Sequence, residues 1–204
     1  MARDKGPRLK KMRALGLNLP GLSRKTMKHR EFPPGEHGHD RRRKPSDYAL
    51  QLKEKQKLRF NYGLGERQFR RLVAEARRGK KAAGDQLLEF LERRLDNVVF
   101  RAGYAPTIPA ARQLVNHGHF TVNGRRVDVS SFRVKEGDVI KPRERSLKLD
   151  VIATSLLGIS LIRPDWIDFN NETLTATVAA LPAPGSVPFP VDVSSVIEYY
   201  AQRL

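Results

Sequence analysis

The basic charge of this chain is unevenly spread along its length, and this distribution limits what the chain can fold into. The 204 residues carry 39 Lys and Arg against 22 Asp and Glu, a net charge of +17. Residues 1–45 hold 14 basic and 4 acidic side chains, residues 46–150 hold 23 and 13, and residues 151–204 hold 2 and 5. A compact protein with such an excess repels itself unless a polyanion neutralises it. Nucleic acid is the expected partner of the first three quarters, and an anionic membrane is the alternative.

The rest of the composition excludes several classes of protein. Hydrophobic residues make up 39% of the chain, below the roughly 45–50% of an average globular protein, so one core or two modest ones are expected. The absence of cysteine excludes disulfides and cysteine-bound zinc. No apolar run approaches the roughly 20 residues of a membrane span, and "MARDKGPRLKK" lacks the apolar segment of a secretion signal. We therefore expect a cytoplasmic protein with no membrane partner.

Residues 1–45 combine Lys and Arg with Gly and Pro and show no sustained hydrophobic period. They predict an extended basic arm with one short helix, ordered mainly by its partner. A plain disordered tail is the alternative, and the leucines at 15, 17, 19 and 22 favour docking over that alternative.

Two helices follow the arm. Ser46 is a good N-cap for the first, and Gly63 and Gly65 end it. The second runs from about Glu66 to Arg78, with apolar residues at helical spacing.

A third helix is expected from near Asp85, because one apolar stripe continues from Leu88 to Ala102. A second stripe on it predicts an exposed phosphate-binding face made by Arg94, Asn97 and Arg101. A solvated charged face is the alternative. Asp96 stands beside two arginines and is expected to orient them.

The period changes from helical to alternating around residue 118. Thr107 is the expected N-cap of a short helix that ends at Gly118 and carries Arg112 on its outside. Asn123-Gly124 is the strongest hairpin signal in the chain. The segments "HFTVN", "RRVDV", "FRV" and "VIK" supply strands of a small antiparallel sheet. "TLTATVAAL" is a further strand candidate, a Pro-rich connector covers 182–190, and "VDVSSVIEYYAQRL" predicts a final amphipathic helix.

Four of the five histidines lie in two H-x-H pairs, His37/His39 and His117/His119. A metal site is disfavoured, because Gly118 is an expected helix stop, no cysteine joins the pairs and no H-E-x-x-H spacing occurs. His117 and His119 are better interpreted as hydrogen-bond donors at a helix-to-strand junction. Nucleophile-elbow, P-loop and Rossmann motifs are also missing, which argues against an enzyme. Sparse aromatics favour structured RNA over single strands, and DNA-type recognition helices do not stand out.

Several segments of the sequence resemble a known protein family. The segment from Arg94 to Ser146 is similar to the alpha-L RNA-binding module of the ribosomal protein S4 family. The matching elements are Arg94-Leu95-Asp96, Ala111-Arg112-Gln113, His117-Gly118-His119, Val122-Asn123-Gly124 and Gly137-Asp138. Upstream, "PPGEHG", "SDYALQLKEKQKLRFNYGLGERQFRR" and "LLEFLERRLDNVVFR" resemble the N-terminal part of the same family, and "VIEYYAQRL" resembles its C-terminal helix.

The resemblance implies an α+β fold in which a helical domain, N-terminal helices plus the C-terminal helix, holds an inserted alpha-L RNA-binding module with a small antiparallel sheet. The expected boundaries are 1–45 for the arm, 46–92 with about 191–204 for the helical domain, and 93–190 for the module and connector. It also implies a primary ribosomal-RNA-binding protein, not an enzyme, that nucleates assembly of the small subunit's body and contributes to translational accuracy. The implied partners are small-subunit ribosomal RNA, ribosomal protein S5, and messenger RNA at its entrance path near residues 41–44.

The basic side chains and their neighbours together predict an RNA-binding set. From the arm and the helical domain it contains Arg41, Arg42, Arg43, Lys44, Lys53, Lys57, Arg67, Arg70 and Arg71. From the module it contains Arg94, Asn97, Arg101, Arg112, Gln113, Asn116, His117, His119, Asn123, Arg125 and Arg126.

Two departures and two alternatives accompany the resemblance. Many members of the family hold zinc on N-terminal cysteines, which this chain lacks, so no cofactor is expected. The connector 182–190 lacks the basic residues expected there.

An RNA-modifying or tRNA-handling enzyme could carry the same module, but the 54 residues after 150 are too few for a catalytic domain. A nonspecific nucleic-acid-coating protein is the other alternative.

Overall fold

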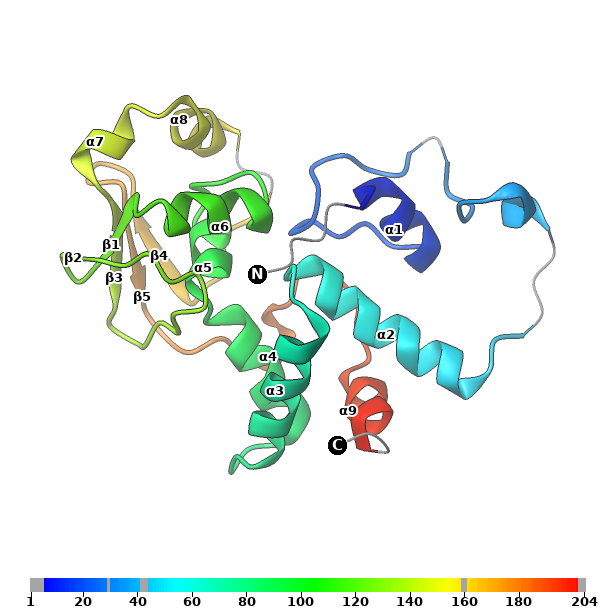
Figure 1. The fold of residues 1–204 in the computed structure, drawn as a ribbon. Helices are drawn as coiled ribbons and strands as arrows, with labels where there is room; N and C mark the ends of the chain where they lie inside the picture. The colour runs from blue at the N-terminus through cyan, green and yellow to red at the C-terminus, as the bar shows by residue number, and fades with distance from the viewer. Residues whose placement is uncertain (1–5, 29, 41–43, 159–160, 202–204) are drawn as a thin grey trace. The chain divides into compact units, whose positions relative to one another are not determined.

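Two compact units make up the protein in a computed structural model that describes residues 6–28, 30–40, 44–158 and 161–201 (Figure 1). Unit 1 combines the chain up to Leu87 with the chain from Pro188 onward, whereas unit 2 is the continuous stretch Leu88–Val187. Unit 1 is helical and unit 2 holds an antiparallel sheet with helices. The prediction of an α+β fold is therefore confirmed.

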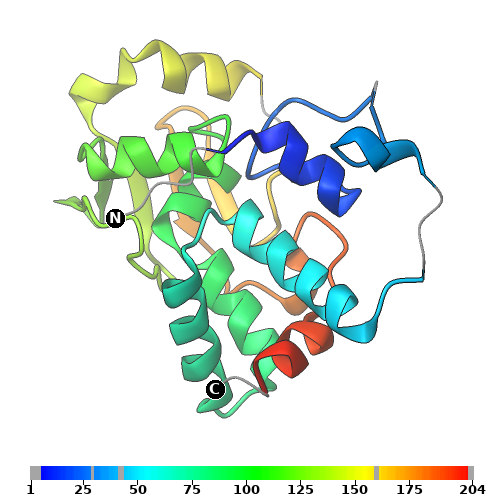
Figure 2. The same cartoon turned by 45° about the vertical axis from the view of Figure 1, so that its right-hand side comes forward.

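Unit 1 is built on a long helix, α2 (Asp47–Asn61), and on the last helix, α9 (Val193–Ala201), which packs along it (Figure 2). The other helices are α1 (Arg8–Leu15), α3 (Glu66–Arg77) and the start of α4 (Ala83–Glu92), and η1 (Glu36–His39) is a 3₁₀ turn. Rings of α9 meet both partner helices: Tyr199 stacks on Tyr48 at 5.8 Å between centroids, and Tyr200 lies 5.9 Å from Phe69. The predicted C-terminal helix thus completes a core begun by the N-terminal helices.

Local signals in the sequence explain where the helices of unit 1 begin and end. The Ser46 hydroxyl accepts a hydrogen bond of 3.3 Å from the Ala49 amide, which is the predicted N-cap of α2. Gly63 adopts φ +59°, a conformation that costs glycine little, and the chain turns there into α3.

The N-terminal region packs on unit 1 through its apolar residues. Leu15, Leu19 and Leu22 are buried, and Leu17 is half-buried. The Asn61 side chain, at the end of α2, accepts a 2.9 Å hydrogen bond from the Gly21 amide. The described part of this region therefore docks, as its leucines indicated.

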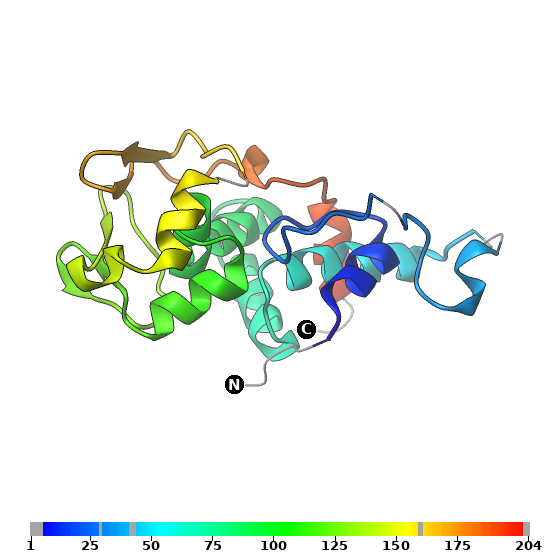
Figure 3. The same ribbon diagram turned by 90° about the horizontal axis from the view of Figure 1, so that it is seen from above.

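Unit 2 contains a five-stranded antiparallel sheet in the order β2-β1-β3-β5-β4. The strands are β1 (Phe120–Val122), β2 (Arg125–Arg126), β3 (Val139–Pro142), β4 (Ile167–Asn170) and β5 (Thr175–Val178). Helices α5 (Leu95–Arg101) and α6 (Ile108–Asn116) pack against each other (Figure 3). The remaining elements are α7 (Glu144–Leu147), α8 (Asp150–Leu157) and the 3₁₀ turn η2 (Pro184–Ser186).

Tyr104 lies in the core of unit 2. Its ring is fully buried 5.3 Å from Phe120, and its hydroxyl donates a 2.7 Å hydrogen bond to the Leu174 carbonyl. Burial raises the pKa of Tyr104 well above its ordinary value, so the hydroxyl stays a donor. This bond ties the turn between β4 and β5 to the core.

The hairpin predicted at Asn123-Gly124 is confirmed. Both residues have positive φ, +51° and +76°, as a two-residue type I′ turn requires. The side-chain Nδ2 of Asn123 donates to the Asp138 carboxylate at 2.8 Å, and the side-chain Oδ1 of Asn123 accepts from the Val139 backbone amide at 2.9 Å. The Asn123 side chain thereby fixes the hairpin to β3.

One predicted helix is in fact two. The apolar stripe from Leu88 to Ala102 suggested a continuous helix, but α4 ends at Glu92 and α5 begins at Leu95. Between the two helices, the backbone of Arg94 forms an isolated antiparallel β-bridge with that of Arg133. The predicted strand "FRV" is therefore present only as this single bridge. The Leu95 amide donates to the Phe132 carbonyl at 2.8 Å, so a distant segment satisfies the backbone where the helix breaks.

None of the helices in the described ranges combines the length and apolar character needed to cross a membrane.

Candidate nucleic-acid interface

The predicted phosphate-binding stripe on α5 is not at the surface. Arg94, Asn97 and Arg101 are only 3%, 1% and 6% exposed, so the prediction that they form an exposed face is wrong. Burying a charge costs free energy unless it is paired, and each of these side chains is held by groups of unit 2. The spacing of residues on a helix does not show this, because Arg94 and Asn97 are held by the nearby carboxylates of Asp96 and Glu92, and Arg101 by the distant Ser186 carbonyl.

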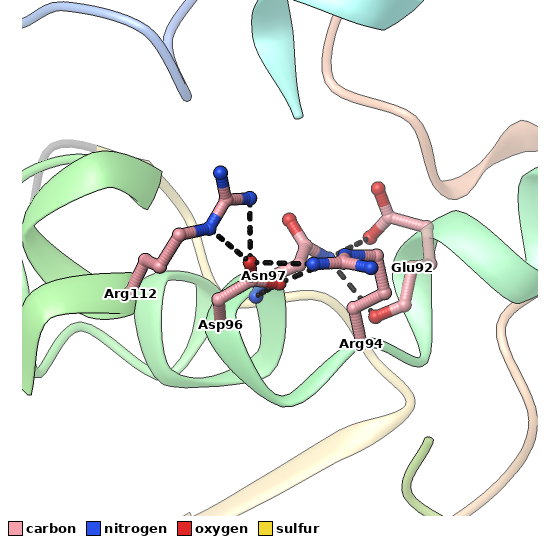
Figure 4. A network of polar contacts seen from close by, with 5 residues as sticks. All are labelled: Glu92, Arg94, Asp96, Asn97 and Arg112. Atoms are coloured by element: carbon pink, nitrogen blue, oxygen red, sulfur yellow. Dashed lines mark hydrogen bonds and ion pairs between the residues drawn. The ribbon is translucent and has the colours of Figure 1, made fainter. Parts of the chain in front are cut away.

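Asp96 lies at the centre of a network of polar contacts (Figure 4). We define the Asp96 network as Glu92, Arg94, Asp96, Asn97 and Arg112. Arg94 donates twice to the fully buried Asp96 carboxylate, at 3.0 and 2.9 Å. Arg112, from α6, reaches the same carboxylate at 2.9 and 2.6 Å. The expectation that Asp96 orients the two preceding arginines is therefore confirmed for Arg94 but not for Arg93, which donates to Glu89 at 2.8 Å.

Glu92 organises the other side of the network. The Asn97 amide group donates to the Glu92 carbonyl and carboxylate, both at 3.0 Å. Arg101 lies 3.6 Å from the same carboxylate and donates to the Ser186 carbonyl at 2.6 Å. The two carboxylates thus join α4, α5 and α6 through charge-assisted hydrogen bonds, and the Glu92–Arg101 ion pair extends this connection to the 3₁₀ turn η2.

Arg112 was predicted to point outward beside Asn116, and this is corrected. Its side chain is 23% exposed and paired with the buried Asp96, whereas Gln113 and Asn116 on the same helix are exposed. Arg112 therefore holds α6 against α5, and its loss is expected to destabilise unit 2.

An exposed basic surface lies where α6 meets the sheet. We define the junction surface as Gln113, Asn116, His117, His119, Arg125, Arg126, Lys141 and Arg143. All of these side chains are exposed except His119, which is half-buried. Strand pairing places Arg126 and Lys141 on either side of β1, because Thr121 is registered with both of them.

The centre of the junction surface is Gly118, with φ +72°. A side chain at this position would collide with Arg126, because a Cβ atom there would lie 2.3 Å from its Nε. Arg143 donates to the Gly118 carbonyl at 3.4 Å, and its amide donates to the His119 carbonyl at 2.9 Å. The predicted bend between α6 and β1 is therefore confirmed, and the arginines that approach it are Arg126 and Arg143.

His119 is tied to α7 and sensitive to its basic neighbours. Its Nδ1 lies 3.0 Å from the Ser146 hydroxyl, and its ring centroid is 6.0 Å from that of His117. Partial burial, together with the charges of His117 and Arg143, lowers the pKa of His119 below its ordinary value of 6.5. The ring is thus biased toward its neutral form in the free protein.

The predicted cations of unit 1 divide into exposed and tethered groups. Arg67, Arg70 and Arg71 are exposed on α3, and Lys44 is exposed before α2. Lys53 and Lys57 are half-buried, and Lys57 forms an ion pair with Glu54 and reaches the Pro190 carbonyl. Arg41, Arg42 and Arg43 lie outside the described residues.

Unit 1 also has an ion pair between the buried Lys55 of α2 and the partly exposed Glu66 of α3. Lys55, 4% exposed, donates to both oxygens of Glu66, and the Tyr200 hydroxyl donates to Glu66 at 2.6 Å. Partial burial alone would raise the pKa of Glu66, but these hydrogen bonds and the charges of Lys55 and Arg59 lower it below 4.5. The predicted amphipathic pattern did not reveal this pair.

Sequence reasoning missed part of the junction surface, namely Lys141 and Arg143. The signal available was "KPRERSLK", a basic run directly after a strand candidate. Across the described ranges, no three His, Cys, Asp or Glu side chains gather closely enough to hold a metal ion. The chain also has no cysteine to supply a thiolate ligand.

Comparison with known sequences matches both parts of the chain. Residues 3–92 match the family described as "Ribosomal protein S4/S9 N-terminal domain", and residues 93–140 match the "S4 domain". A small ribosomal subunit protein uS4 from Methylobacillus flagellatus is 58% identical over the full length of both chains. The chain belongs to the ribosomal protein S4 family.

Other uS4 proteins show the same relationship. The uS4B protein of Nitrosomonas europaea is 52% identical over the full length of both chains. The uS4 of Brevibacillus brevis is 46% identical over 99% of this chain and all of its own. The resemblance inferred from the sequence is thus confirmed, and with it the prediction of a ribosomal protein rather than an enzyme.

Proposed function

We propose that this chain is a primary ribosomal-RNA-binding protein of the small ribosomal subunit, which nucleates assembly of the subunit's body and contributes to translational accuracy. The observation that carries the proposal is the junction surface, which lies largely within the segment that matches the S4 domain. It concentrates Arg125, Arg126, Lys141 and Arg143 around one helix end. Arginine forks suit phosphate oxygens, and a surface of this kind reads RNA by backbone and shape.

The cations of α3 provide a second basic surface. Arg67, Arg70 and Arg71 are exposed on the face opposite to its buried apolar residues. In this proposal residues 93–190 supply the RNA-binding module, residues 46–92 with about 191–204 form the helical domain, and residues 1–45 form a basic arm. The buried Arg94, Asn97 and Arg101 act within the fold rather than on RNA.

The expected neighbours are other components of the small subunit. The family resemblance extends the proposal to ribosomal protein S5 and to messenger RNA near residues 41–44, of which Lys44 is exposed. Crosslinking from position 44 in assembled subunits, read by mapping of the crosslinked nucleotides, tests the contact with messenger RNA. Crosslinks only to ribosomal RNA would overturn this part of the proposal.

Binding to small-subunit ribosomal RNA as a function of salt tests the main proposal. The log of the affinity should fall linearly with the log of the salt concentration, with a slope of roughly 0.7–0.9 per neutralised phosphate. The double variant Arg125→Ala/Arg126→Ala should reduce this slope by one to two such steps and leave the fold intact.

The matched control keeps the charge and removes only the forked donors: Arg125→Lys/Arg126→Lys should retain most of the slope. Footprinting on the RNA should show protection at defined helices that the alanine double variant weakens. Equal affinity for ribosomal RNA and for a random duplex at every salt concentration would overturn specific binding in favour of nonspecific coating.

A further inference from the structure

The two histidines of the junction surface have an arginine from β2 and an arginine that precedes α7 close to the bend between them. His117 ends α6, and His119 begins the approach to β1 with its ring 6.0 Å away. Arg126 of β2 lies against Gly118 between them, and Arg143 bonds to the backbone of Gly118 and His119. From α7, the neutral Ser146 hydroxyl meets His119 at 3.0 Å.

Carboxylates do little to offset this charge. Asp128 lies 3.7 Å from Arg126, but both side chains are 57% exposed, so water screens the pair strongly. Glu144, next in sequence to Arg143, is exposed in the first turn of α7. By comparison, His37 of the other H-x-H pair is 2.7 Å from the Asp40 carboxylate. His117 and His119 therefore stand in a surface whose charge an external anion would balance.

A phosphate group on this surface changes the cost of protonating the imidazoles. In the free protein, partial burial and the neighbouring positive charges lower the pKa of His119. A nearby phosphate favours the charged form of an imidazole by direct attraction and by accepting its N–H. The bound state should therefore hold protons that the free state lacks.

We propose that His117 and His119 form a proton-linked phosphate subsite, so that RNA binding at the junction surface takes up protons and strengthens as the pH falls. The inference rests on the proposed RNA-binding function and adds a regulation to it. Linkage fixes its sign: affinity rises between the pKa values of the bound and free states, by at most about tenfold per pH unit for each histidine involved.

The test is the affinity of the full chain for small-subunit ribosomal RNA between pH 5.5 and 8 at constant ionic strength. We expect affinity to increase as pH falls through 6.5, and His119→Asn and His117→Gln each to flatten this dependence. Far-ultraviolet circular dichroism at each pH checks that the variants remain folded. The exposed His117 keeps the test decisive even if His119→Asn weakens the fold.

The chain offers a matched control in its second H-x-H pair. His37→Asn removes an exposed imidazole from a basic region but should leave the pH dependence unchanged. Loss of the pH dependence in this variant, or its absence in the wild-type chain, would overturn the inference while RNA binding itself persists. Absence of RNA binding at every pH would overturn the proposed function instead, so the two failures are distinguishable.

Discussion

Arg94 and Arg125 belong to the same unit but differ in role: Arg94 stabilises the fold, and Arg125 is proposed to bind RNA. Arg94 is 3% exposed and bonded twice to the buried Asp96, whereas Arg125 is exposed on β2 beside the hairpin turn. What separates them is a carboxylate within reach. Inside the fold, arginine satisfies a buried acid, and at the surface the same residue type is left for an external anion.

Removing the buried arginine of this comparison should have the largest effect on stability. Arg94→Ala leaves the Asp96 charge without one of its two arginines and should lower the free energy of unfolding by about 3–5 kcal/mol. Denaturant unfolding, with hydrogen exchange at the amides of α5 and α6, measures the loss. Arg125→Ala is the control and should change stability by no more than about 0.5 kcal/mol. Equal stability of the two variants would remove the distinction.

Arg112 sharpens the comparison, because it is partly exposed and paired with the same carboxylate. Arg112→Ala should lower the free energy of unfolding by about 1.5–3 kcal/mol, since Asp96 keeps Arg94. The neighbouring exposed Gln113→Ala is the control and should unfold like the wild-type chain. If Arg112→Ala instead weakened RNA binding at full stability, Arg112 would belong with the exposed group.

Glu66 extends the comparison to unit 1 and makes it depend on pH. Its folded pKa is depressed, so its contribution to stability is complete above pH 4.5 and is lost as the pH falls through the folded value. Tyr200→Phe removes one of its donors and should cost about 1 kcal/mol at neutral pH. Thermal unfolding from pH 3 to 7 should show a shallower acid loss in this variant, and an unchanged profile would contradict the role of the hydroxyl.

The smallest expected effect lies on the exposed side. Arg125→Ala alone should weaken binding to small-subunit RNA by roughly two- to fivefold at moderate salt, and Arg125→Lys by less, because the charge is retained. Competition binding with labelled RNA resolves differences of this size. A greater loss with Lys than with Ala would show that charge is not the determinant.

The parts of the fold predicted correctly depend on residues close together in the sequence. Ser46 and Thr107 cap their helices through hydroxyls that accept amide hydrogen bonds three residues ahead. Asn123 and Gly124 supply the two positive φ angles of the hairpin. These signals act within one turn of chain, so a single sequence is enough to reveal them.

The parts that were missed depend on partners distant in the sequence. The break between α4 and α5 is set by pairing with residues 132–134, about 40 positions away. Arg101 was predicted to face RNA from its place in the helical stripe, and its burial was missed because Ser186, its partner at 2.6 Å, lies 85 positions along the chain. Strand β4 and helices α7 and α8 were also missed, since short elements carry few turns of periodic signal.

The discontinuity of unit 1 has a consequence for the order of events during synthesis. Translation completes residues 88–187, all of unit 2, before it reaches α9. Until then Glu66 lacks its hydrogen bond from Tyr200, Phe69 lacks its ring contact with Tyr200, and α2 lacks the helix that packs along it. The emerging chain can therefore fold the module that carries the junction surface first, and the helical unit closes only when its last helix leaves the ribosome.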